Sequence, residues 1–129
     1  MAKGNSAIVI DSDRIDFYKH FLNFMKPINP ISKLQNKQIE ILASLLYKRW
    51  EIEQKVNDYT LIPKLLFSID SRNDIMKMCG ITDTNYYGVI SIFKKLKIIV
   101  DNDLSKKVIP ESVNDKFSLI IAFTIHDKE

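Results

Sequence analysis

The stretch from Ser71 to Pro110 constrains the fold of this 129-residue chain more than any other part of the sequence. At its centre Gly80 stands between two segments whose apolar residues recur at helical spacing. Glycine readily adopts the left-handed backbone that ends many helices, and Thr82 can then cap a following helix. The pattern therefore predicts two short helices joined by a tight turn.

Each of the two helices has a recognisable start and an inward side. Ser71 is the expected cap of the first helix, with Asp74 at its third position. The first helix is expected to bury Ile75, Met78 and Cys79, with Ile81 filling the turn. The second, over about 83–96, is expected to bury a stripe that runs through Tyr86, Ile90, Phe93 and Leu96.

A hairpin is expected after the second helix. Residues 98–100 are β-branched and favour a strand, and the polar residues 101–103 favour a turn. Residues 107–109 favour a returning strand, which Pro110 ends because proline cannot donate to a strand ladder. The hairpin should therefore cover about 98–109.

The first third of the chain predicts one strand and two helices. Residues 7–10 are apolar and suit a strand, and residues 11–13 can cap a helix that runs to about Lys26, where prolines follow. Ser32 with Gln35 resembles a capping box for a helix over 33–56. That helix is apolar on two sides, which predicts either a central place in the core or a subunit interface.

The remaining segments complete one expected domain. Pro63 suits the first turn of a short segment over 64–69, and residues 118–125 suit a strand that pairs with the hairpin or with residues 7–10. No linker, repeat or low-complexity tract divides the sequence. We expect a single domain over 1–129: an N-terminal strand and helix (1–32), a core (33–110) and a C-terminal strand (111–129).

The charge of the chain favours no strong electrostatic attraction to nucleic acid. The net charge is +3, but residues 1–69 carry ten Lys and Arg against seven Asp and Glu, whereas residues 70–129 carry nine of each. No apolar run approaches the ~20 residues that span a bilayer, and no signal-peptide pattern opens the sequence. A cytoplasmic protein without a membrane partner is expected.

Residues that commonly carry catalysis or bind metals are scarce. The three glycines are far apart, so no phosphate-binding loop is predicted. His20 and His126 lack companions at metal-ligand spacing, and the single cysteine, Cys79, lies on an apolar helix side. We expect no enzyme activity, no cofactor, no metal site and no small-molecule substrate.

The segment Gly80-Ile81-Thr82, followed by a helix that ends in Lys94-Lys95-Leu96-Lys97-Ile98-Ile99, resembles the winged helix-turn-helix superfamily. The resemblance covers about 40 residues, and about half the chain if the helix at 33–56 is included. It implies an α+β fold, mainly α: a winged helix-turn-helix with an added N-terminal helix and a small β-sheet formed by the wing and the terminal strands. Composition rich in Ile, Lys and Asn but poor in Arg is also similar to small winged-helix proteins of tailed phages. The sequence departs from the family at Met76, Asp83, Gly88 and Lys97.

The resemblance implies binding of double-stranded DNA through the helix at 83–96 and the wing at 98–109. Asn85 and Thr84 have side chains suited to base edges, and Asp83 would oppose the phosphates. Tyr87 suits either a partner surface or packing. The full set of candidate DNA-binding residues is Thr84, Asn85, Tyr87, Ser91, Lys94, Lys95, Lys106 and Lys107.

Two classes of function stay open. One is a small transcription regulator or replication accessory that binds DNA as a dimer, because paired half-sites multiply a modest affinity. The other is a structural or adaptor protein, such as a phage virion or head–tail connector component, in which the scaffold makes protein–protein contacts. The exposed polar residues of the second helix also have a simple interpretation as solvated surface. A homo-oligomer or larger assembly is expected in either class.

Overall fold

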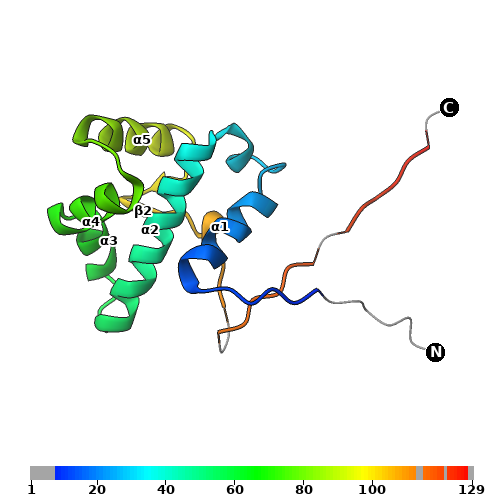
Figure 1. Ribbon diagram of the computed structural model, residues 1–129, viewed down its shortest axis with the longest axis horizontal. Helices are drawn as coiled ribbons and strands as arrows, with labels where there is room; N and C mark the ends of the chain where they lie inside the picture. The colour runs from blue at the N-terminus through cyan, green and yellow to red at the C-terminus, as the bar shows by residue number, and fades with distance from the viewer. Residues whose placement is uncertain (1–7, 113–114, 121, 128–129) are drawn as a thin grey trace.

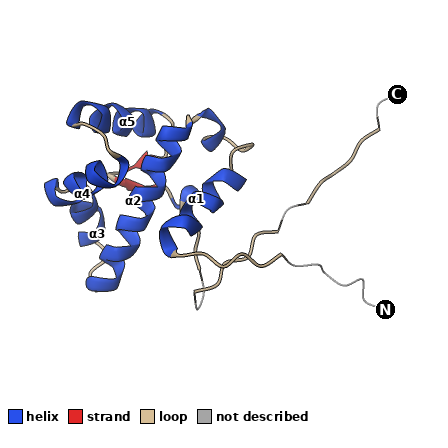
Figure 2. Ribbon diagram, in the orientation of Figure 1, coloured by secondary structure: helices blue, strands red, loops and turns tan. Residues whose placement is uncertain are grey.

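The computed structural model of the chain (Figure 1) describes residues 8–112, 115–120 and 122–127. Within these residues the fold is mainly helical, with five α-helices and one small antiparallel sheet (Figure 2). The helices are α1 Arg14–Phe24, α2 Asn36–Lys55, α3 Leu61–Leu66, α4 Ile69–Cys79 and α5 Asp83–Lys95. The strands are β1 Ile99–Val100 and β2 Asp103–Leu104, and two short 3-10 helices are η1 Ile31–Lys33 and η2 Lys106–Val108. The expected α+β, mainly α class is confirmed.

Helix α2 lies at the centre of the core. It packs against α1, α3 and α4, and the six consecutive residues 41–46 are all buried. A helix that buries its whole circumference over one and a half turns has neighbours on every side. Of the two positions that the sequence allowed for this helix, the structure shows the central one.

Helix α1 begins where the sequence predicts and α2 does not. Asp13 caps α1 by accepting a hydrogen bond from the Asp16 amide at 2.9 Å. The expected cap Ser32 instead lies within η1, and α2 begins after Gln35, whose amide donates to Gln38 Oε1 at 2.9 Å. The capping-box interaction is therefore made one turn later along the chain than predicted.

Helix α4, in contrast to α2, begins earlier than predicted. Its cap is Ser68, whose hydroxyl accepts from the Ser71 amide at 3.3 Å. Ser71, the expected cap, is buried in the first turn and donates its hydroxyl to the Leu65 carbonyl at 2.6 Å. Judged from sequence alone, either serine could cap α4. The hydrogen bond of Ser71 to Leu65 of α3 leaves Ser68 as the cap.

Of the three residues that α4 was expected to bury, Ile75 and Cys79 are buried, but Met78 is 43 % exposed, so that part of the prediction is wrong. The turn between α4 and α5 forms as predicted. Gly80 is left-handed with φ +63°, and the Ile81 amide returns to the Met76 carbonyl at 3.1 Å. Thr82 then caps α5 by accepting from the Asn85 amide at 3.3 Å. Gly80 is conformationally required here, because other residues rarely adopt this backbone.

The hairpin is shorter than the predicted 98–109. Ile99 pairs with Leu104 and Val100 with Asp103, so only Asp101 and Asn102 form the turn. Both turn residues are left-handed, at φ +53° and +62°, which is the geometry of a two-residue hairpin turn. The predicted returning strand at 107–109 is wrong, because the chain after β2 enters η2, capped by the Ser105 hydroxyl.

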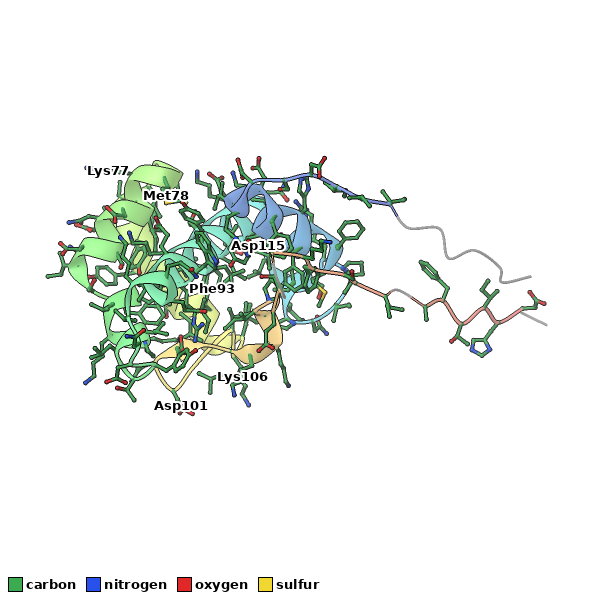
Figure 3. All side chains as sticks on the ribbon, turned by 90° about the horizontal axis from the view of Figure 1, so that it is seen from below. Lys77, Met78, Phe93, Asp101, Lys106 and Asp115 are labelled. Atoms are coloured by element: carbon green, nitrogen blue, oxygen red, sulfur yellow. The ribbon has the colours of Figure 1, made fainter. Side chains whose placement is uncertain are left out.

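The two expected terminal strands are also absent from the described residues. Residues 8–10, 118–120 and 122–125 have no strand pairing, while Ala7 and Ile121 lie outside the described part. Both segments leave the helical body at the α1 end, in the view of Figure 1 and in that of Figure 3. None of the described helices combines the length and apolar composition that crossing a bilayer needs.

Candidate nucleic-acid interface

Helix α5 has one covered and one uncovered side. Tyr86, Ile90 and Phe93 are buried, and Phe93 lies inside the body in Figure 3. At 100° per residue, the positions opposite this stripe are Thr84, Gly88, Ser91 and Lys95. The structure therefore leaves a line of small polar residues, ending in lysine, open to solvent.

All six candidate residues on α5 are exposed. Asn85 lies on one flank of the uncovered line, and Tyr87 and Lys94 lie on the other. Exposure is what both DNA contact and simple solvation require of these side chains. The exposed set on α5 is Thr84, Asn85, Tyr87, Ser91, Lys94 and Lys95.

Lys106 and Lys107 are exposed but do not lie on the hairpin, which corrects the predicted wing. They belong to η2, and Lys107 lines one small hollow together with Lys97 at the C-terminal end of α5. The hairpin tip instead carries Asp101 and Asn102, both exposed. The lysines after α5 thus gather near its C-terminal end, whereas the tip is acidic.

No ion pair to these lysines occurs among the described residues. Lys48, by contrast, lies 2.5 Å from Asp74 Oδ2, and the hydrogen bond that Lys48 donates to this carboxylate is the main reason that the Lys48 pKa is raised. In the described part, only Lys37 and Lys48 among the lysines have an ion pair. The lysines near the C-terminal end of α5 that have none are Lys94, Lys95, Lys97, Lys106 and Lys107. Their charge is therefore available to an anionic partner.

Arg72 of α4 is a member of this surface that sequence reasoning missed. Its Nη1 donates to the Tyr87 hydroxyl, and its Cζ lies 5.5 Å from the Tyr87 ring centroid. Its Nε lies 3.5 Å from Asp83 Oδ1. A hydrogen bond to Tyr87 raises the pKa of Arg72. The only indication of this contact in the sequence was that Arg72 and Asp83 lie 11 residues apart, on either side of the glycine turn.

This contact changes the interpretation of Asp83 and Tyr87. Asp83, which would oppose phosphates if it were unpaired, has a cationic neighbour that reduces its field. Tyr87 is exposed, but its hydroxyl is held by Arg72, so it is partly committed to joining α4 and α5. Beneath it, burial raises the pKa of Tyr86 to about 12, so this phenol is neutral at physiological pH.

An open groove of about 680 Å³ lies beside α5, between α3, the start of α4 and the hairpin turn. Its walls include Phe67, Ile69 and Tyr87, with Lys94 at one side and Asp101 at another. The lining side chains can make apolar contacts and bind charges. Within the described residues, no group of three or more His, Cys, Asp or Glu side chains is placed to hold a metal ion.

The hairpin is held against the centre of the core by a bidentate ion pair. Arg49 of α2 donates to Asp103 through Nε at 3.2 Å and through Nη2 at 3.1 Å. Both side chains are mostly buried, and two parallel hydrogen bonds fix orientation better than one. The pair sets the position of the hairpin tip relative to α5.

No protein-family model, no curated protein and no solved structure matches this chain. The surface of α5 is therefore interpreted from its own geometry and chemistry.

Proposed function

We propose that this chain is a non-enzymatic winged helix-turn-helix module that binds double-stranded DNA, with α5 as the recognition helix. The order of α2, α4, α5 and a hairpin supports this assignment, as does the three-residue turn at 80–82 between α4 and α5. A recognition helix presents its solvent side to base edges while its apolar stripe stays in the protein. The biological role that fits is a small regulator or replication accessory.

The observation that carries the proposal is the uncovered side of α5. It is polar along its length and ends among lysines that have no ion pair in the described part of the molecule. Phosphate contacts from lysines position a protein on the duplex, and polar side chains nearer the bases read the sequence. The arrangement offers both types of group on one helix.

Gly88 adds a second observation. Glycine within a helix costs roughly 0.5–1 kcal/mol relative to alanine. A Cβ built on Gly88 would meet nothing within 4 Å, so internal packing does not require glycine at this position. A partner that approaches the α5 backbone closely would account for it, as a groove wall or a base edge does.

Within this proposal the residues have distinct roles. Asn85 can bond bidentately to adenine, and Thr84 and Ser91 can contact base edges. Lys94 and Lys95 reach phosphates from the end of α5. Lys106 and Lys107 would add phosphate contacts from η2 rather than from a wing. The hairpin tip carries Asp101, which would repel the phosphates of DNA.

A salt titration of duplex binding tests the proposal. Affinity should fall steeply between roughly 50 and 200 mM salt, and the slope of log K against log salt should be roughly −3 to −4 if Lys94, Lys95, Lys106 and Lys107 contact phosphates. Lys94→Ala with Lys95→Ala should weaken binding to all sequences about equally and reduce the slope by about 2. The matched control is Lys19→Ala with Lys55→Ala, which removes the same charge from α1 and α2.

The proposal fails if no duplex binds even at low salt, or if the control pair lowers the slope as much as the α5 pair. Asn85→Ala gives a further readout, because it should relax base preference at one position while leaving the salt slope unchanged.

A structural or adaptor role is the second candidate. The observation that favours it is the acidic hairpin tip at Asp101, beside a groove with apolar walls. An absence of duplex binding, together with a defined oligomer by mass measurement, would favour this role over the first.

A further inference from the structure

The open groove beside α5 carries more positive than negative side chains. Lys64 of α3, Arg72 of α4 and Lys94 of α5 line it, and among the described residues of its walls Asp101 alone is acidic. Neither lysine has an ion pair within the described part of the chain. Asp83 lies 3.5 Å from Arg72 Nε but does not line the groove. The groove therefore has a surplus of positive charge that an acidic partner would complement.

The walls between these charges are apolar. Phe67 is half-buried, whereas Ile69 is 66 % exposed and Tyr87 54 % exposed. Ile90 and Ile99, which are both buried, also line the groove. Large apolar side chains that are exposed together in a groove with polar edges are typical of a binding surface. An apolar side chain that enters this groove would cover both exposed residues.

Tyr86 adds a buried polar group without a partner in the described chain. The residue is 3 % exposed and lines the groove, and its hydroxyl makes no hydrogen bond with another described residue. Among the described side chains, only Arg72 has an atom that is both fully enclosed and without a hydrogen bond, so the Tyr86 oxygen still touches open space. Buried polar groups are almost always hydrogen-bonded. An acceptor on a bound molecule would satisfy this hydroxyl.

The guanidinium of Arg72 also has donors to spare. Its Nη1 donates to the Tyr87 hydroxyl, while Nη2 and Nε make no hydrogen bond with a described residue. A guanidinium offers five N–H donors and no acceptor. The unused groups of Arg72, Tyr86 and the two lysines can all donate. A carboxylate is the side-chain group that accepts from several such donors at once.

We infer that this groove binds an acidic, apolar peptide segment of a partner protein, with a carboxylate at Arg72 and Tyr86 and an apolar side chain against Ile69. Small-molecule sites enclose roughly 70–90 % of their ligand, whereas a segment of chain can lie across an open groove. A DNA phosphate would use the donors but would gain nothing from the apolar walls. The inference does not rest on duplex binding.

Peptide display on the full chain tests this inference. Peptides selected from a random library of about 12 residues should combine aspartate or glutamate with large apolar residues, the composition that acidic-motif recognition requires. Fluorescence anisotropy then measures the labelled consensus peptide, whose Kd should rise at least about tenfold with Lys64→Glu and with Ile69→Asp. Lys77→Glu is the matched control for charge, because Lys77 lies outside the groove and at the opposite edge of the body from Asp101 in Figure 3.

Tyr86→Phe gives a readout that a structural role would not produce. It removes only a hydroxyl without a described partner, so the free energy of unfolding in urea should stay the same while the peptide Kd rises about threefold to tenfold. Duplex affinity should not change. A library without an acidic, apolar consensus, or a consensus peptide that binds all three groove variants like wild type, would overturn the inference. Variants that lose duplex affinity and no peptide affinity would assign the groove to DNA instead.

Discussion

The glycine at position 88 lowers the stability of α5, but it would favour a partner that approaches the helix backbone closely. Replacing it with alanine should raise the free energy of unfolding by roughly 0.5–1 kcal/mol, because the added Cβ meets nothing and the helix gains a better former. If DNA or another partner approaches α5 closely, Gly88→Ala should weaken that binding at the same time. Urea unfolding measures the first effect and fluorescence anisotropy with a labelled duplex the second.

Gln54→Ala is the control for Gly88→Ala. Gln54 is exposed near the C-terminal end of α2, far from α5 in Figure 1, so this change should leave binding unaltered. Stabilisation by Gly88→Ala without any loss of binding would show that α5 is not closely approached at this position.

For single residues of α5, burial or exposure was easier to predict from the sequence than which side chains contact one another. The helical spacing of Tyr86, Ile90 and Phe93 correctly predicted which side of α5 is buried. The contact of Arg72 with Tyr87 and Asp83 was not predicted. It depends on how α4 crosses α5, and spacing within one helix contains no information on that crossing.

Gly80 has the opposite role to Gly88, at the scale of the element it ends. Gly80→Ala should lower the free energy of unfolding by about 1 kcal/mol, because alanine is strained at φ +63° although its Cβ would meet no neighbour. Gly80→Asn should lose less, since asparagine tolerates the left-handed region better. Urea unfolding of the three proteins gives the order, and a neutral Gly80→Ala would contradict the left-handed turn.

The ends of elements were less predictable than their existence. Two serines could cap α4, and the contact with α3 selects Ser68 over Ser71. Asp101 and Asn102 both turn left-handed and set the point of reversal, and the hairpin is short because α5 runs to Lys95 before it and η2 begins at Lys106 after it. Polar residues in a row indicate a turn, but they do not say which two of them form it.

For the whole molecule, Phe117 joins the helical body to the extended C-terminal arm, residues 118–120 and 122–125. Phe117→Ala should lower the free energy of unfolding by about 1–3 kcal/mol, because the side chain is half-buried against Phe17 and Phe21. Phe123→Ala should leave it unchanged under monomeric conditions, since Phe123 is exposed. Urea unfolding at low protein concentration separates the two. Equal effects of the two changes would mean that the arm is not anchored at Phe117.

The sequence by itself determined the main helices, the buried side of α5 and where glycine ends α4, because these depend on spacing and backbone preference over a few residues. It predicted the buried side of α4 only in part, since Met78 is exposed. Only the tertiary structure decided that α2 lies at the centre, that Asp83 and Tyr87 share Arg72, and that residues 107–109 do not return as a strand. It also shows no strand pairing for the described parts of the two predicted terminal strands, residues 8–10, 118–120 and 122–125. A strand needs a neighbour to satisfy its backbone, and a sequence that favours a strand does not contain that neighbour.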